Sequence, residues 1–163
     1  MTQFWFAAST EQFTPTEMLE QATAAESAGF EALASSDHFA PWWPEGKASF
    51  AWTTLAAIGQ HTTKPIGTSV TPVVHDYHPG VIAQAFMGLE ELYPERVFLG
   101  VGSGESVNEV PLGADPEDQI NRIRETEESG ATVVCLQCIG ADPIGSIERY
   151  GQHVLPALTG ARV

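Results

Sequence analysis

The chain has 163 residues, a length that suits one domain with a buried core. Its 21 acidic residues against 7 Lys and Arg give a formal net charge of −14, which argues against nucleic acid as a partner because phosphates are bound by clustered cations. No apolar run approaches a membrane span, and the N-terminus lacks a basic and then apolar targeting pattern, so we expect a cytoplasmic protein. An acidic surface also suits a salt-rich cytoplasm, as in a halophile, where salt screens self-repulsion.

Apolar periodicity and capping residues predict strands that alternate with helices along the whole chain. The expected strands are 3–8, 30–35, 66–71, 96–102 and 132–139. The expected helices are 15–29, 49–61, 79–92, 116–130 and 143–158. Strands separated by helices pair in parallel through right-handed crossovers, so the predicted fold class is α/β with about five parallel strands.

The first helix has the clearest signals at its ends. Thr14 is a suitable N-cap, Pro15 suits the first helical position, and Glu17 completes a capping box. Gly29 is placed to end the helix before the next apolar run.

Polar side chains gather where the predicted strands end. Glu11 follows the first strand, Asp37 and His38 follow the second, residues 69–72 end the third, and 103–108 follow the fourth. In parallel α/β folds, ligands bind beyond the carboxyl ends of the strands. We therefore expect one site there, with ordinary polar loops as the alternative interpretation.

Glycines alternate at the end of the fourth predicted strand, at positions 100, 102 and 104. The dinucleotide fingerprint G-x-G-x-x-G would need a glycine where Glu105 stands, and it normally follows the first strand, which argues against a Rossmann fold. Alternating glycines instead indicate that something flat or bulky approaches this backbone closely.

Two short motifs could suggest metal or redox chemistry. Cys135 and Cys138 lie three residues apart in an apolar strand, which places them on opposite faces and favours buried thiols. His75 and His78 have H-x-x-H spacing, but a loop that turns and caps a helix uses the same residue types. We expect no metal site.

Five segments resemble the luciferase-like flavin and deazaflavin oxidoreductases, and in particular the coenzyme F420 branch that includes glucose-6-phosphate dehydrogenases. They are S-T-E-Q-F (9–13), S-D-H-F-A-P-W (36–42), G-T-S-V-T-P (67–72), Y-H-P-G-V-I-A-Q-A (77–85) and R-V-F-L-G-V-G-S-G-E-S-V-N-E (96–109). Their order and spacing are those of that family's first four βα units.

The resemblance implies a (β/α) TIM-type barrel, a fold of about 250 residues with eight strands. Only about five strands are expected here, and residues 114–158 resemble the family's C-terminal end. The sequence therefore predicts a single domain over 1–163, a shortened or incomplete barrel with an apparent internal deletion near 113–114. The missing strands would carry the family's site for the cofactor's phosphate and much of its substrate site, which makes glucose 6-phosphate an unfavourable substrate.

The resemblance also implies catalytic roles. His38 would take the substrate hydroxyl proton as hydride leaves, Glu105 would be the second acid or base, and Trp42 would form a wall of the site. Glu11 is a candidate for substrate contact. The structural alternatives are a histidine that is only hydrogen-bonded and a tryptophan that is only packed.

The implied cofactor is coenzyme F420, with FMN as the alternative. Asp37 would hydrogen-bond the deazaflavin, and Ser69 and Val70 match the family position of a cis peptide bond that bulges against the ring. The remaining candidate cofactor-binding residues are Ser103, Gly104 and Asn108.

The sequence leaves three functions open. The first is an F420-dependent oxidoreductase that transfers hydride between the cofactor and an alcohol or a related small substrate. The second is a shortened, non-catalytic relative that binds a flavin or pairs with a full-length homologue, and the third is an inactive remnant. Because an open sheet leaves edges and apolar surface exposed, we expect a homo-oligomer or a complex with a homologue.

Overall fold

The computed structural model describes residues 2–41, 44–72, 77–102, 115–138 and 140–160. The strands are β1 (Gln3–Ala8), β2 (Ala32–Ser35), β3 (Ile66–Pro72), β4 (Val97–Gly102) and β5 (Val133–Gln137). The helices are α1 (Pro15–Ala28), α2 (Ala51–His61), α3 (Pro79–Leu92), α4 (Pro116–Glu128), α5 (Pro143–Arg149), the π-helical η1 (Tyr150–Val154) and α6 (Leu155–Thr159).

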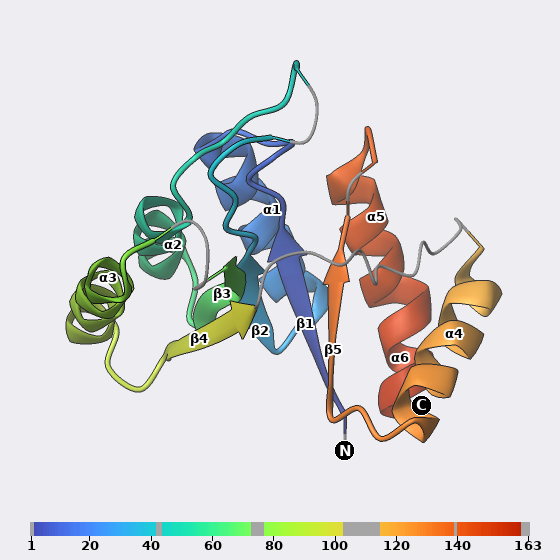
Figure 1. The fold of residues 1–163 in the computed structure, drawn as a ribbon. Coiled ribbons are helices and arrows are strands. Elements are labelled where there is room, and N and C mark those ends of the chain that lie inside the picture. The colour runs from blue at the N-terminus through green and yellow to red at the C-terminus, as the bar shows by residue number, and fades with distance from the viewer. Residues whose placement is uncertain (1, 42–43, 73–76, 103–114, 139, 161–163) are drawn as a thin grey trace.

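The five strands form one parallel sheet in the order β4-β3-β2-β1-β5 (Figure 1). The predicted α/β class, with five parallel strands alternating with helices, is confirmed. The last strand returns to lie beside the first, with Phe4 opposite Val134. That neighbour relation is the one that a closing strand has in a barrel.

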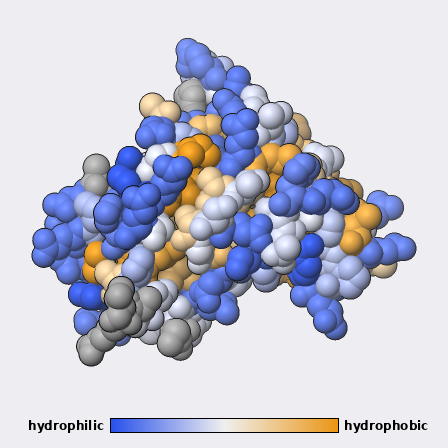
Figure 2. All heavy atoms as spheres, turned by 180° about the vertical axis from the view of Figure 1, so that it is seen from behind, coloured by the Kyte–Doolittle hydropathy of each residue, from blue (hydrophilic) through white to orange (hydrophobic). Residues whose placement is uncertain are grey.

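The helices lie behind the sheet and at its sides in the view of Figure 1. Seen from behind, their outer surface is mainly hydrophilic, with separate hydrophobic patches (Figure 2). Between the helices and the sheet lies the core, to which β1 contributes Phe4 and Phe6, and α2 contributes Leu55 and Ile58. Full burial of a side chain of this kind stabilises the fold by roughly 1.5–3 kcal/mol. No helix in the described part of the chain is long and apolar enough to cross a membrane.

The opposite face of the sheet is concave. The rings of Trp5 on β1 and Phe98 on β4 lie 4.5 Å apart between centroids, although β2 and β3 separate these two strands in the sheet. Gly67 makes room for this contact, since a Cβ there would lie 2.6 Å from a ring carbon of Phe98. The sheet is therefore strongly curved, as a segment of a barrel would be.

The start of β2 differs from the expectation because of the way α1 ends. Gly29 adopts a left-handed conformation with φ 97°, and the Phe30 N–H donates to the Ala25 carbonyl oxygen. Phe30 is fully buried and belongs to this helix cap, so the strand begins two residues later, at Ala32. The predicted capping box of Thr14 and Glu17 is confirmed.

The single helix expected after residue 142 contains a wider π segment. Pro156 has no N–H to bond the carbonyl of Gln152, so the regular pattern is broken there. The Leu155 N–H instead donates to Tyr150, five residues back. Along this segment Gly151 lies so close to α1 that a Cβ would be 2.7 Å from the Cβ of Ala28.

The alternating glycines of β4 accommodate β3. A Cβ at Gly100 would collide with the backbone carbonyl of Thr68, and a Cβ at Gly102 would lie 2.6 Å from Cγ2 of Val70. The expected close approach is therefore present within the sheet, where the bulky neighbour is an adjacent strand.

The close approach of Gly102 to Val70 predicts that substitutions at these two positions compensate each other. Gly102→Ala should lower the free energy of unfolding by about 1–3 kcal/mol because its methyl group overlaps Val70. Val70→Ala in the same chain should restore most of the loss, since the side chain of Val70 is itself 44% exposed. The measurement is urea unfolding of both single variants and the double variant.

The matched control is Gly88→Ala in α3, where a Cβ would meet nothing within 4 Å. It should stabilise the helix by about 0.5–1 kcal/mol. Equal losses for Gly102→Ala with and without Val70→Ala would contradict the contact.

Both outer strands of the sheet also predict association. Within the described residues, β4 and β5 each pair with one strand only, and hydrophobic side chains are exposed on them: Leu99 (38%), Val101 (56%) and Val133 (37%). Unpaired apolar edges favour contact with another chain. Light scattering should therefore show species larger than a monomer, and a monodisperse monomer would refute this expectation.

Candidate functional site at the carboxyl ends of β1, β2 and β3

Two polar turns are brought together by the pairing of β1 with β2. Ala8 and Ser35 are paired residues at the ends of these strands, and the Ser36 N–H donates to the Ala8 carbonyl oxygen. Each strand then continues directly into polar residues, Ser9-Thr10-Glu11 after β1 and Ser36-Asp37-His38 after β2. Parallel pairing thus places these two triplets side by side.

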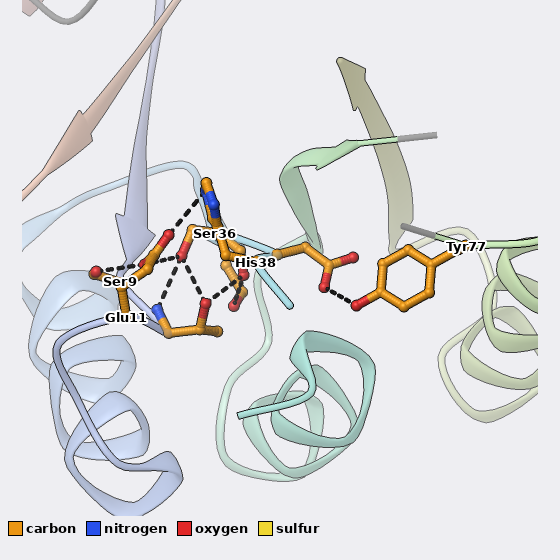
Figure 3. A network of polar contacts seen from close by, with 8 residues as sticks. Ser9, Glu11, Ser36, His38 and Tyr77 are labelled. Atoms are coloured by element: carbon orange, nitrogen blue, oxygen red, sulfur yellow. Dashed lines mark hydrogen bonds and ion pairs between the residues drawn. The ribbon is translucent and has the colours of Figure 1, made fainter. Parts of the chain in front are cut away.

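Glu11 is the centre of this cluster. Its side chain is 2% exposed, and Oε2 accepts hydrogen bonds from the hydroxyls of Ser9 at 2.6 Å and Ser36 at 2.7 Å (Figure 3). Oε1 lies 2.8 Å from Nε2 of His38. A buried carboxylate is thus surrounded by donors from the ends of both strands.

The pKa of Glu11 reflects two opposed effects. Burial raises it, but the hydrogen bonds from His38, Ser9, Ser36 and the backbone of Glu11 outweigh burial and lower the pKa from 4.5 to about 2. Glu11 is therefore ionised throughout the neutral range.

His38 is the exposed member of this pair. Its side chain is 23% exposed, whereas that of Glu11 is almost completely buried. A carboxylate that holds one ring nitrogen fixes the orientation of an imidazole and stabilises its protonated form. The arrangement differs from a nucleophile triad, because both serine hydroxyls donate to the carboxylate itself. The geometry suits proton transfer by His38.

Asp37 points the other way, toward β3 and the loop before α3. It is fully buried, and its carboxylate accepts a hydrogen bond from the hydroxyl of Thr71 at 2.8 Å. A second hydrogen bond comes from the hydroxyl of Tyr77 at 3.0 Å (Figure 3). The ring of Tyr77 also packs 6.0 Å from that of Phe50. In this structure Asp37 joins three segments, and its expected hydrogen bond to a cofactor stays a prediction.

The end of β3 contains the cis peptide bond between Ser69 and Val70 that the family resemblance implies. Val70 is exposed and Ser69 is partly exposed, so this segment presents both residues at the surface. Thr71 directly follows it and is bonded to Asp37, which connects the segment to the end of β2.

Five predicted site residues lie outside the described part of the chain. They are the catalytic candidates Trp42 and Glu105 and the cofactor candidates Ser103, Gly104 and Asn108. His75 of the H-x-x-H motif is also outside it, whereas His78 is the N-cap of α3 and accepts from the Gly80 N–H. His78 thus has the helix-capping role that the alternative interpretation gave it.

The two cysteines have different environments. Cys138 is buried, and burial raises the pKa of its thiol to about 11, as expected for an inert core cysteine. Cys135 has exposed surface, so the expectation that both thiols are buried is wrong for this residue, although desolvation by the surrounding chain still raises the pKa of its thiol to about 11. It pairs with Trp5 of β1 and therefore shares the face of the sheet on which Trp5 contacts Phe98.

The sequence did not assign a role to the individual hydroxyl donors Ser9, Thr10, Ser36, Thr71 and Tyr77, although Thr71 lies in the predicted stretch 69–72. All but Tyr77 lie at or directly after a strand end, the same signal that selected Glu11, Asp37 and His38. Neighbouring parallel strands end at the same edge, so a hydroxyl at that position can reach the carboxylate of the next strand.

The sequence model of the luciferase-like monooxygenase family matches residues 1–129, which is most of the chain. The chain belongs to the luciferase-like monooxygenase family. Among curated relatives, it is 49% identical over 132 residues to the F420-dependent glucose-6-phosphate dehydrogenase of Nakamurella multipartita, and 44% identical over 128 residues to that of Mycobacterium tuberculosis. The two alignments cover 78% and 74% of this chain but 38% of each relative.

Solved structures of F420-dependent enzymes resemble the fold of this chain. An F420-dependent secondary alcohol dehydrogenase in complex with an F420-acetone adduct matches with a TM-score of 0.60 and 35% identity, over 77% of this chain and 41% of that one. The coenzyme F420-dependent tetrahydromethanopterin reductase of Methanopyrus kandleri matches in fold, with a TM-score of 0.54 at 23% identity, over 64% of this chain and 28% of the other. The family resemblance read from the five segments is confirmed, and the chain spans less than half the length of these proteins.

The burial of an ionised Glu11 predicts a pH-dependent effect of Glu11→Gln. A carboxylate whose folded pKa is about 2, against 4.5 for the free side chain, stabilises the fold above pH 4.5, and that contribution is lost as the pH falls toward 2. This contribution of Glu11 to the free energy of unfolding amounts to roughly 3 kcal/mol. Glu11→Gln should therefore be less stable than the parent protein at pH 7, and the gap should shrink between pH 4.5 and 2.

Urea unfolding at pH 7, 5 and 3 measures this effect. The control is Glu20→Gln, which removes the same charge from an exposed position of α1. If Glu11→Gln and Glu20→Gln follow the same curve with pH, the buried carboxylate does not contribute as described.

Proposed function

We propose that the protein is an F420-dependent oxidoreductase that transfers hydride between the deazaflavin and an alcohol or a related small substrate. The observation that carries this proposal is the pair formed by a buried, ionised Glu11 and a partly exposed His38 at the carboxyl ends of parallel strands. The names of the relatives, which are F420-dependent dehydrogenases, support the choice of cofactor.

The residues at the strand ends fit the ring portion of such a cofactor. A flat heterocycle needs an apolar surface and a nearby polar group, and the exposed Val70, with Ser69 beside it, offers both. The Asp37–Thr71 hydrogen bond holds this segment against the chain that carries His38. Ser69, Val70 and His38 would thus contact the ring. FMN has a ring of the same shape and is the alternative ligand.

The chemistry that F420 supplies, when bound, is reversible hydride transfer at its ring. Oxidation of an alcohol also releases the hydroxyl proton, and His38 would accept it. Glu11 stabilises the imidazolium that results, because its carboxylate is ionised and 2.8 Å from Nε2. In the reverse direction His38 returns the proton to the carbonyl oxygen. Glu105 and Trp42 are proposed as further catalytic residues.

A second candidate is a non-catalytic relative that binds a flavin or completes its site with another chain. The edges of β4 and β5, each paired with one strand only among the described residues, favour it. In that case a second copy or a full-length homologue would be the partner.

Titration with oxidised and reduced F420, and separately with FMN, followed by an assay with a secondary alcohol, distinguishes the candidates. The proposal predicts F420 binding and turnover, with turnover at least about 100-fold lower in His38→Ala, the usual contribution of a general base. His153→Ala, which removes an exposed histidine of η1, is the control and should change neither. F420 binding without turnover would support the second candidate, and absence of F420 binding would overturn the proposal.

A further inference from the structure

The hydroxyl groups around Glu11 have only one consistent arrangement of their hydrogens. Oγ of Ser36 lies 2.8 Å from the backbone nitrogen of Thr10, 3.0 Å from its hydroxyl and 2.7 Å from Oε2 of Glu11. The backbone N–H can only donate, and an ionised carboxylate can only accept. The single hydrogen of Ser36 must therefore point at Glu11, and the contact between the two hydroxyls must be donated by Thr10.

The same assignment of hydrogens to donors and acceptors applies to the other groups around the Glu11 carboxylate. Ser9 donates its hydrogen to Oε2, so this oxygen accepts two hydroxyls. Oε1 of Glu11 is buried without a well-formed hydrogen bond, and it lies 2.8 Å from Nε2 of His38. Because neither carboxylate oxygen carries a proton, this close contact is favourable only when Nε2 carries one.

We propose that Ser9 and Ser36, with Thr10 behind them, hold Glu11 as a fixed acceptor and thereby keep His38 in the tautomer that carries its proton on Nε2. Ser36 is then a positioning residue, which acts on His38 through Glu11. The neighbouring acid Asp37 does not compete for this nitrogen, because its carboxylate is hydrogen-bonded to the hydroxyls of Thr71 and Tyr77.

The consequence concerns the atom that exchanges the proton. In the neutral ring of this tautomer the unshared pair is on Nδ1, and in the imidazolium both nitrogens carry hydrogen. Nε2 stays protonated in both states, so the proton that is gained or lost is the one on Nδ1. As a step of catalysis this rests on the proposed function, but the tautomer itself is a property of the chain without cofactor.

Two other histidines provide references in the same molecule. Nδ1 of His61 lies 3.0 Å from the carbonyl oxygen of Ala57, an acceptor, so His61 carries its proton on Nδ1. Nδ1 of His78 accepts from the Gly80 N–H at 3.1 Å, so His78 carries its proton on Nε2. The two tautomers can therefore be compared within one spectrum.

The test is a long-range proton–nitrogen correlation NMR spectrum of the ¹⁵N-labelled full chain at alkaline pH, without cofactor. His38 should show the pattern of His78 and not that of His61. In Glu11→Gln the two hydroxyl donors hold the amide oxygen, the amide nitrogen faces His38, and the ring should change to the pattern of His61. A parent protein with the proton on Nδ1, or a tautomer unchanged by Glu11→Gln, would overturn the proposal.

Ser36→Ala tests the positioning role without removing the carboxylate. Loss of one hydroxyl donor should raise the titration midpoint of the Glu11 carboxyl carbon by about one pH unit, and the weaker hold on Glu11 should lower the share of His38 that carries its proton on Nε2. Ser27→Ala, at an exposed position of α1, should leave this midpoint unchanged. An unshifted Glu11 in Ser36→Ala would refute the role of Ser36. Both measurements are independent of F420 binding, so their failure is distinguishable from failure of the proposed function.

Discussion

The buried carboxylate of Glu11 is the interaction on which the site depends. Removing a carboxylate from water is costly unless donors replace the water, and here the donors come from the ends of two strands, Ser9 after β1 and Ser36 after β2. The donors are in place only in one register of β1 against β2, the one that pairs Ala8 with Ser35. Pairing of the strands and formation of the site are thus the same event.

The protein uses carboxylates and hydroxyls to join its strand ends where many proteins use ion pairs with Lys or Arg. Asp37 repeats the arrangement of Glu11 one strand further along, with Thr71 and Tyr77 as donors. At the opposite end of the sheet a cation makes the connection, because Arg96 donates hydrogen bonds to the carbonyl oxygens of Thr62 and Lys64. This division agrees with a net charge of −14, in which few cations are available for pairing.

The alternation of strands with helices and most helix ends could be predicted because their signals are local. Thr14, Glu17 and Gly29 mark the ends of α1 by their own chemistry, and Glu11 and His38 could be placed at strand ends by counting along the chain. What joins Glu11 to His38 depends on strand register, which no local pattern specifies. The same limit applies to Gly100 and Gly102, whose neighbour across the sheet is visible only once β3 and β4 are paired.

The curvature of the sheet explains how five strands can carry an ordered set of strand ends. The contact of Trp5 with Phe98 spans four strands, so the inner face is set by side chains that β1 and β4 supply themselves. The return of β5 to the side of β1 adds a second neighbour to the strand that leads into Glu11. β1 and β2 are therefore both interior strands, and the Glu11–His38 pair lies where the sheet is supported on both sides.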